Sequence, residues 1–280
     1  MEAFKFISML FLFATLLLII FGSCFCCADI NMDSDKQCSK SDSSTAENNF
    51  QTNLKNLLDS LTQNGPLLNG FYTTSAGDRS DQIFGLVQCR GDISPDNCGS
   101  CIKNSSDFAL SYCPESREVV LWFTWCFLRY STENFIGVLG LTSVALSNDT
   151  NYDDPSVVSN GLSLMSGLAS SAPNQRLMFQ TAVLNAGQRG KRYGMAQCTR
   201  DISASDCAQC LNSQLETFRT TIGSKKDWEI YGFNCFMWYH DHQFYFNYSV
   251  STSAGGRCLF SEGGRTVCIS ITVLMLLMIL

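Results

Sequence analysis

The stretch Cys89-Arg-Gly-Asp-Ile-Ser-Pro-Asp-Asn-Cys98-Gly-Ser-Cys101 sets three cysteines at the spacing Cys-x8-Cys-x2-Cys. The same spacing recurs at Cys198, Cys207 and Cys210, which is a shift of 109 residues, and that shift also carries Cys126 onto Cys235. Around these cysteines, Gly85-Leu-Val-Gln-Cys89 matches Gly194-Met-Ala-Gln-Cys198, and Asp92-Ile-Ser94 matches Asp201-Ile-Ser203. One constant shift through four cysteines indicates that the chain holds two copies of one module.

The copies divide the chain into domains. We expect module one at residues 29–142 and module two at residues 156–252. They are joined by a linker at residues 143–155, whose polar run is Ser147-Asn-Asp-Thr-Asn-Tyr-Asp-Asp-Pro155.

Each module is predicted to be α+β, with two amphipathic helices on one face of an antiparallel sheet. Apolar side chains recur at helical spacing at Phe50, Leu54, Leu57, Leu58 and Leu61, and at Cys207, Cys210, Leu211, Leu215 and Phe218. Aromatic and β-branched residues favour strands at residues 70–75, 82–88, 118–131 and 135–141.

An aromatic band marks the predicted strand 118–131. Alternation along one strand would place Trp122 on the face of Cys126, and Phe123, Trp125 and Phe127 on the other. Because the helices cover one face, the outward aromatics are expected to be buried against the second module or to form an exposed patch that recognises another extracellular protein. The band in module two is Tyr231, Phe233, Phe236, Trp238 and Tyr239.

Composition limits the function classes. The 280 residues are 45% apolar, which is enough to bury a core in each module. The net charge is -6 and no run of Lys or Arg could track phosphates, so nucleic acid is not an expected partner. Fifteen cysteines indicate an oxidising compartment.

Both ends resemble processing signals. Residues 1–28 read as a secretory signal peptide, with an apolar run at 6–21 and cleavage after Ala28; an uncleaved anchor is the alternative. Residues 253–280 read as a signal for a glycosylphosphatidylinositol anchor, because the apolar run 267–280 falls short of a bilayer span. The other readings of this tail are a marginal membrane anchor and a segment that packs on the protein. Candidate attachment residues are Ser253, Ala254 and Gly255.

Three sequences of the Asn-x-Ser/Thr type predict N-glycosylation, at Asn104, Asn148 and Asn247. We therefore expect a secreted, extracellular protein, tethered to the outer face of the plasma membrane if the lipid anchor is used.

Ten cysteines remain once both ends are removed. Cys38 and Cys113 of module one have no counterparts in module two, and the simplest account is that they pair with each other. The four shared cysteines of each module allow three connectivities. A zinc site and a redox dithiol are the rival readings of Cys-x2-Cys.

Catalytic machinery is not apparent. No Ser-His-Asp, Cys-His or paired-carboxylate constellation recurs in both copies, so no enzyme, resident metal or cofactor is expected. His240-Asp241-His242 places two imidazoles on one face and would bind a metal if a third ligand approached. A solvent-facing loop is the simpler interpretation.

The spacing from Cys89 to Cys101, followed by Cys113-Pro114 and Cys126-Phe-Leu-Arg-Tyr-Ser131, resembles the plant cysteine-rich repeat secretory proteins, whose module is similar to the antifungal protein ginkbilobin-2. The resemblance implies two helices on a five-stranded antiparallel sheet in each module. It also implies the disulfides Cys38–Cys113, Cys89–Cys98, Cys101–Cys126, Cys198–Cys207 and Cys210–Cys235.

The same resemblance implies a mannose site built from an Asn, an Arg and a Glu. The matching positions of module one hold Ser39, Val120 and Ser131, and module two has Glu229 and His240 at the last two. We therefore expect a non-catalytic binding protein of plant defence or stress responses, whose partner is an extracellular protein or a cell-wall glycan. A mannose-binding antifungal protein is the alternative.

Overall fold

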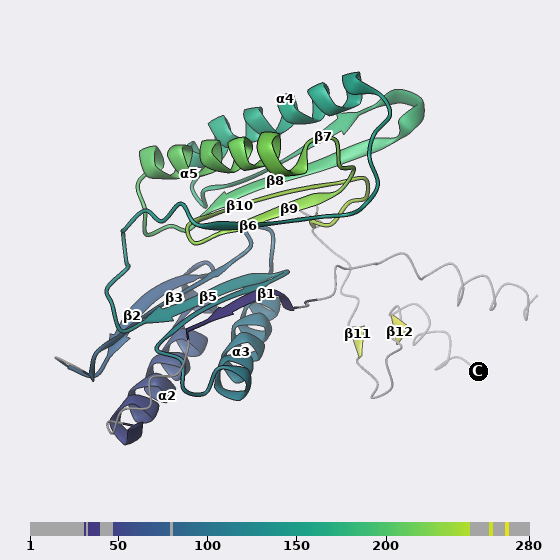
Figure 1. The fold of residues 1–280 in the computed structure, drawn as a ribbon. Coiled ribbons are helices and arrows are strands. Elements are labelled where there is room, and N and C mark those ends of the chain that lie inside the picture. The colour runs from purple at the N-terminus through teal and green to yellow at the C-terminus, as the bar shows by residue number, and fades with distance from the viewer. Residues whose placement is uncertain are drawn as a thin grey trace, which may run out of the picture. The chain divides into compact units, whose positions relative to one another are not determined.

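Two sheets, each with two helices, make up the part of the chain that carries the repeat. The computed structural model describes residues 31, 33–39, 47–78 and 81–246, together with the two-residue strands β11 (Cys258–Leu259) and β12 (Val267–Cys268), which pair antiparallel. Residues Asn31–Phe246 form one unit. Each sheet is antiparallel and five-stranded, as the family resemblance implies (Figure 1).

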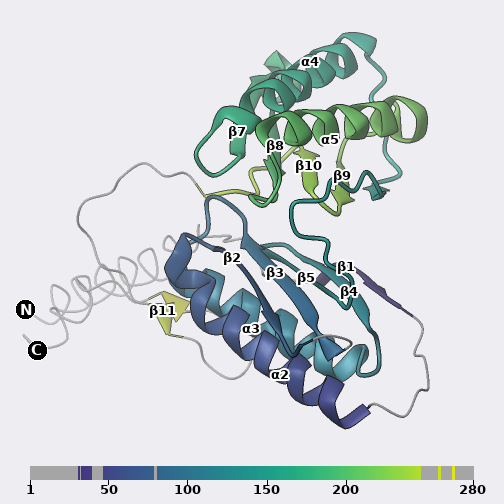
Figure 2. The ribbon, with the colours of Figure 1, turned by 90° about the vertical axis from the view of Figure 1, so that its left-hand side faces the viewer.

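Module one has the strand order β1-β4-β5-β3-β2. Its helices are α2 (Glu47–Asn64) and α3 (Pro95–Tyr112), which lie along one face of the sheet (Figure 2). A short 3-10 turn at Pro66–Leu68 follows α2. The strands are β1 (Asp33–Cys38), β2 (Phe71–Ala76), β3 (Ile83–Cys89), β4 (Glu118–Phe123) and β5 (Cys126–Ser131).

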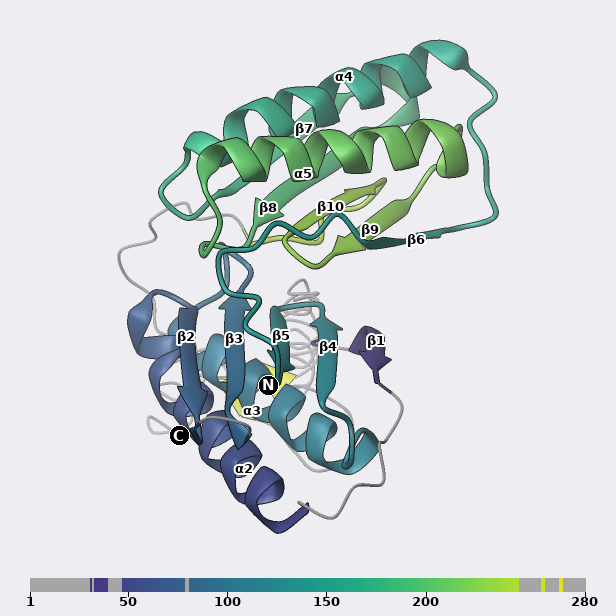
Figure 3. The same ribbon diagram turned by 60° about the vertical axis from the view of Figure 1, so that its left-hand side comes forward.

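Module two repeats this plan with the order β6-β9-β10-β8-β7. Its helices α4 (Pro155–Ser171) and α5 (Ala204–Thr217) again cover one face (Figure 3), and α5 continues into a π-helical turn at Phe218–Ile222. Two 3-10 turns lie at Ala172–Asn174 and Gly187–Arg189. The strands are β6 (Ser143–Ser147), β7 (Phe179–Asn185), β8 (Lys191–Cys198), β9 (Trp228–Gly232) and β10 (Cys235–His240).

The expected linker at residues 143–155 is wrong in its first part. Ser143–Ser147 is the edge strand β6, which pairs with β9, so the second sheet begins at residue 143 and not after residue 155. β6 occupies the edge that β1 occupies in module one. Its half-exposed residues carry too weak an apolar pattern to be recognised as a strand.

The expected strand at residues 135–141 is also wrong. The structure has no strand there, and Gly137 adopts a positive φ of 75° within a turn. The fifth strand of the first sheet is β1 instead, with the sequence Asp-Ser-Asp-Lys-Gln-Cys. An edge strand needs no apolar run, because one side of its backbone and much of its side-chain surface face water.

The predicted single strand 118–131 is a hairpin that turns at Thr124 and Trp125. The turn reverses the alternation, so Trp122 and Phe127 are cross-strand partners on one face. Phe123 and Cys126 lie with the helix-side core. The expected grouping of Trp122 with Cys126 and of Phe123 with Phe127 is therefore wrong.

Local capping places the cysteines on the helices. Ser94 accepts a hydrogen bond from the Asn97 N–H at the start of α3, and Ser203 accepts one from the Asp206 N–H at the start of α5. These are the serines of the repeated Asp-Ile-Ser. Each cap begins a helix so that Cys98 or Cys207 lies in its first turn.

Five disulfides fix the helices to the sheets. They are Cys38–Cys113, Cys89–Cys98, Cys101–Cys126, Cys198–Cys207 and Cys210–Cys235, which are the pairs that the family resemblance implies. The two cysteines of each Cys-x2-Cys therefore bond to different partners, which leaves neither a dithiol nor a thiolate pair for zinc.

Several sequence expectations lie outside the described residues. They are the signal peptide at residues 1–28, Asn247, and Ser253, Ala254 and Gly255. Among the residues that the structure does describe, no helix combines the length and hydropathy that a membrane span requires.

Candidate functional site

The helix-free faces of the two sheets meet in a third apolar cluster. Its aromatic members come from both modules and include Trp122 and Phe127 from the first and Tyr231, Phe236 and Trp238 from the second. Trp122 is 1% exposed and donates its indole N–H to the Gly232 carbonyl at 3.0 Å. The outward aromatics are thus buried between the modules, and they do not form an exposed patch.

Two glutamines join the modules by matching hydrogen bonds. Gln88 Nε2 donates to the Cys198 carbonyl at 2.7 Å, and its Oε1 accepts from the Arg200 N–H at 2.9 Å. Gln197 Nε2 donates to the Cys89 carbonyl at 3.0 Å, and its Oε1 accepts from the Gly91 N–H at 3.3 Å. Residues related by the 109-residue shift therefore make the same bonds in opposite directions.

The aspartate of each repeated Asp-Ile-Ser accepts a hydrogen bond from the backbone of the other module. Asp92 accepts from the backbone N–H of Phe246, which follows module two's sheet, at 2.7 Å. Asp201 accepts from the N–H of Gly137, which follows module one's sheet, at 2.9 Å. Asp92 also forms a buried ion pair with Arg90, at 2.7 Å from Nε to Oδ1. Each module thus binds the segment that follows the last strand of the other module's sheet.

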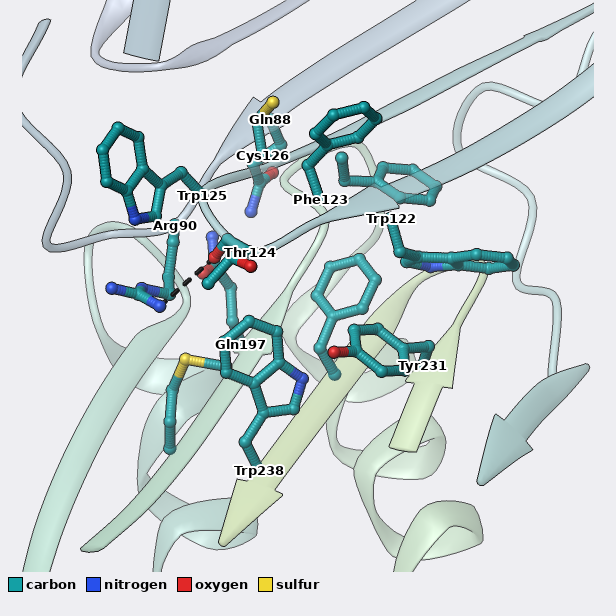
Figure 4. A pocket seen from close by; sticks show the side chains of 13 residues that line it. Gln88, Arg90, Trp122, Phe123, Thr124, Trp125, Cys126, Gln197, Tyr231 and Trp238 are labelled. Atoms are coloured by element: carbon teal, nitrogen blue, oxygen red, sulfur yellow. Dashed lines mark hydrogen bonds between the residues drawn. The ribbon is translucent and has the colours of Figure 1, made fainter. Parts of the chain in front are cut away.

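A cavity of about 30 Å³ lies within this interface. Figure 4 shows Trp122, Gln197, Tyr231 and Trp238 around it, with the Arg90 guanidinium bonded to the Thr124 carbonyl. The volume suits one or two water molecules.

Polar side chains converge where β9 begins and β10 ends. Glu229 Oε1 lies 2.8 Å from His240 Nε2, and its other oxygen accepts from the Tyr231 hydroxyl. Asp227 Oδ2 accepts from the Asn148 side-chain amide, and its Oδ1 accepts from the Asp241 N–H at 2.8 Å. We call Asn148, Asp227, Glu229, His240 and His242 the polar cluster.

The electrostatics of the polar cluster favour an ionised Glu229. Burial alone would raise the pKa of Glu229, but the hydrogen bond and charge of His240 outweigh it. The Tyr231 hydroxyl and the charge of His242 act in the same direction, so the pKa of Glu229 lies below its ordinary value.

The predicted solvent-facing loop at His240-Asp241-His242 is half right. His242 is exposed, with 67% of its side chain accessible, whereas the His240 side chain is 13% accessible and lies at the end of β10. A third group does approach: ligand atoms of Asp227, His240 and His242 all lie within 4.8 Å of one another.

The sequence does not single out Asp227, and it marks Asn148 only as a glycosylation candidate and not as a member of this cluster. The 109-residue shift carries Ser39 onto Asn148 and Glu118 onto Asp227. The backbone confirms this equivalence, because the Ser39 N–H donates to the Glu118 carbonyl and the Asn148 N–H donates to the Asp227 carbonyl. The signal that could have placed both residues here is the 109-residue shift, applied beyond Cys38 even though module two has no cysteine at that position. Module two thus holds Asn148, Glu229 and His240 at the three positions where module one holds Ser39, Val120 and Ser131.

Two of the predicted glycosylation residues can be located. Asn104 is exposed on α3, and Asn148 is half-buried directly after β6, with its amide bonded to Asp227.

Comparison with known proteins finds one family model, described as salt stress response/antifungal, that matches residues 20–133 and 145–242. The chain is 31% identical over 220 residues to cysteine-rich repeat secretory protein 55 of Arabidopsis thaliana, covering 75% of this chain and 82% of that protein. It is 30% identical over 209 residues to an antimicrobial ginkbilobin-2-like protein of Castanea crenata, covering 74% and 86%.

Receptor kinases and a solved structure are also similar. The chain is 32% identical to a putative cysteine-rich receptor-like protein kinase of Arabidopsis thaliana, over 86% of this chain, and spans 38% of that kinase. The tandem DUF26 ectodomain of the Arabidopsis thaliana cysteine-rich receptor-like protein PDLP8 superposes with a TM-score of 0.66 at 26% identity, over 76% of this chain and 99% of that one.

Proposed function

Because this chain belongs to the cysteine-rich repeat secretory protein family and carries two tandem stress-antifungal domains, we propose that it is a secreted, non-catalytic binding protein of plant defence or stress responses. The observation that carries the proposal is the polar cluster. It gathers an amide, two carboxylates and two imidazoles on module two. The aromatic faces of the sheets, by contrast, are buried in the contact between the modules. The disulfides support a non-catalytic role, since the ten cysteines of the two modules are all bonded.

The primary partner is an extracellular protein. We expect the labelled mature chain to bind intact plant cell walls or protoplasts, and Asp227→Asn to weaken that binding. Glu118→Gln, at the matching position of module one, serves as the control. Trypsin treatment of the cell surface should abolish binding. Equal binding by the wild-type and Asp227→Asn chains would contradict the assignment to the polar cluster.

Carbohydrate binding is the second candidate, and Asn148 is the observation that favours it. An asparagine, Glu229 and His240 occupy in module two the positions at which the family resemblance implies a mannose site, and sugars require several such convergent donors and acceptors. Retention on mannan that is lost in Glu229→Gln would support this candidate. Failure to bind any glycan on an array would reject it and leave the protein partner.

Localisation follows from the processing signals. We propose that the protein acts in the extracellular space, with glycans at Asn104 and Asn247 and lipid attachment at Ser253, Ala254 or Gly255. At Asn148 a glycan and a binding role are alternatives, because its amide is the group that contacts Asp227. Mass spectrometry of the mature protein would read the glycans and both termini. Release from plant membranes by a phosphatidylinositol-specific phospholipase C should occur if the anchor is used, and retention would contradict it.

A further inference from the structure

The two histidines of the chain lie together beside Asp227, within the polar cluster of module two. The exposed side chain of His242 approaches His240, with ring centroids 5.0 Å apart. His240 Nδ1 lies 3.9 Å from Asp227 Oδ1, which is longer than a hydrogen bond. Two ligands of one tetrahedral zinc ion stand about 3.4 Å apart, so small side-chain movements would bring the three groups to ligand distance.

Neighbouring groups hold His240 and Asp227, and the exposed His242 contacts the Asp241 carboxylate at 3.3 Å. His240 Nε2 lies 2.8 Å from Glu229. In the neutral imidazole that donates its Nε2 hydrogen to Glu229, Nδ1 carries the lone pair, on the side of Asp227. A carboxylate on the second ring nitrogen is the usual support of a metal-bound histidine. Asp227 is itself fixed by the Asn148 amide and the Asp241 N–H, and each of its oxygens keeps a second lone pair.

We propose that Asp227, His240 and His242 bind a divalent transition-metal ion of the Zn²⁺ class, with Glu229 as the positioning residue behind His240. Two imidazoles and one carboxylate are a zinc donor set that leaves a fourth position for water or a ligand. The site goes beyond the proposed function, because neither a protein partner nor a glycan is needed for it. Module one lacks it, since Ser131 and Glu133 stand where module two has His240 and His242.

Zinc titration of the full chain tests the site. Free thiols are first alkylated without reduction, so that cysteines outside the disulfides cannot bind the metal. Zinc sulfate is then titrated against a chromophoric chelator. We expect one zinc per chain, with affinity weakened at least about tenfold by His242→Ala and about tenfold by Glu229→Gln. Glu133→Ala, the matched position in module one, should leave the affinity unchanged.

His242→Ala is the decisive variant because its exposed side chain contributes little to folding, and far-ultraviolet circular dichroism would verify that the fold is retained. Cobalt substitution should give a d–d absorption spectrum of nitrogen and oxygen ligands that His242→Ala removes. Absence of stoichiometric zinc binding, or equal affinity in the wild-type and His242→Ala chains, would overturn the proposal. Either result would leave cell-wall and glycan binding untouched, so the two proposals fail separately.

Discussion

At the scale of single residues, the repeated Gly-x-x-Gln-Cys serves both faces of one strand. Gly85 faces α2, where a Cβ atom would come within 2.9 Å of the Leu57 and Leu61 side chains, and Gly194 faces α4 in the same way. Gln88 and Gln197 face the opposite direction, into the contact between the modules. Alternation along a strand explains why both kinds of residue recur at fixed positions.

Gln88 and Gln197 should have coupled effects on the free energy of unfolding, so that the cost of replacing both differs from the sum of the two single costs. Gln88→Ala removes two hydrogen bonds and leaves the Cys198 carbonyl and the Arg200 N–H without that partner, at a cost of about 1 to 3 kcal/mol in the free energy of unfolding. Gln197→Ala should cost a similar amount. Denaturant unfolding of both single variants and the double variant measures this. Gln82→Ala, whose exposed amide bonds Ser75, is the control, and a cost equal to the control's would contradict the prediction.

Tyr130 carries a buried hydroxyl that makes no hydrogen bond to the residues that the structure describes. Tyr130→Phe should therefore raise the free energy of unfolding at neutral pH by about 1 kcal/mol. Burial raises the pKa of Tyr130 above its ordinary value, so ionisation of the hydroxyl is less favourable in the folded chain than in the unfolded chain. Stability is therefore unaffected by this group below the unfolded pKa of about 10 and falls as the pH rises from there through the folded pKa.

The measurement is the unfolding free energy of the wild-type and Tyr130→Phe chains from pH 7 to pH 11. The wild-type chain should lose stability more steeply above pH 10. Tyr112→Phe, on a side chain that is 67% exposed, should change neither value. A Tyr130→Phe variant less stable than wild type at pH 7 would contradict the prediction.

At the scale of elements, the edge strands differ in how they are secured. β1 pairs only with β4 in the sheet and is tied to the end of α3 by Cys38–Cys113. β6 has no disulfide. At the position that corresponds to Cys113, module two has Ile222, which is buried in the turn after α5. Module two therefore replaces a covalent tie with apolar packing.

Removal of Cys38–Cys113 by the double variant Cys38→Ser and Cys113→Ser should destabilise module one by about 4 kcal/mol, because the bridge closes a long loop in the unfolded chain. β1 should also lose protection in amide hydrogen exchange, whereas β6 should keep its own. Protection of β1 equal to that in the wild-type chain would show that pairing with β4 suffices.

At the scale of the whole molecule, the two sheets share an apolar layer that neither module could bury alone. Hydrogen bonds from Gln88 and Gln197 join the two modules beside this aromatic layer. Asp92 and Asp201 add hydrogen bonds, each to the backbone of the other module. Because the layer is internal, its aromatic side chains are buried and do not form an exposed face.

Trp122→Ala should disrupt this layer. The side chain is 1% exposed and contacts Tyr231 and Phe233 of the other module, so its truncation should cost about 3 to 5 kcal/mol. Binding of a fluorescent anilinonaphthalene dye should increase as apolar surface is exposed. Leu67→Ala, on a side chain that is 79% exposed, is the control. Unchanged stability in Trp122→Ala would contradict a shared core.

The sequence by itself determined the duplication, the helices and most of the buried strands, because cysteine spacing, helix caps and apolar periodicity are local signals. It did not reveal the edge strands β1 and β6, whose half-exposed side chains carry no such pattern, nor the turn at Thr124 that places Trp122 and Phe127 on one face. Only the tertiary structure decided which aromatics are internal. It also brought Asn148, Asp227 and the two histidines together, because pairing of β6, β9 and β10 joins residues that lie far apart along the chain.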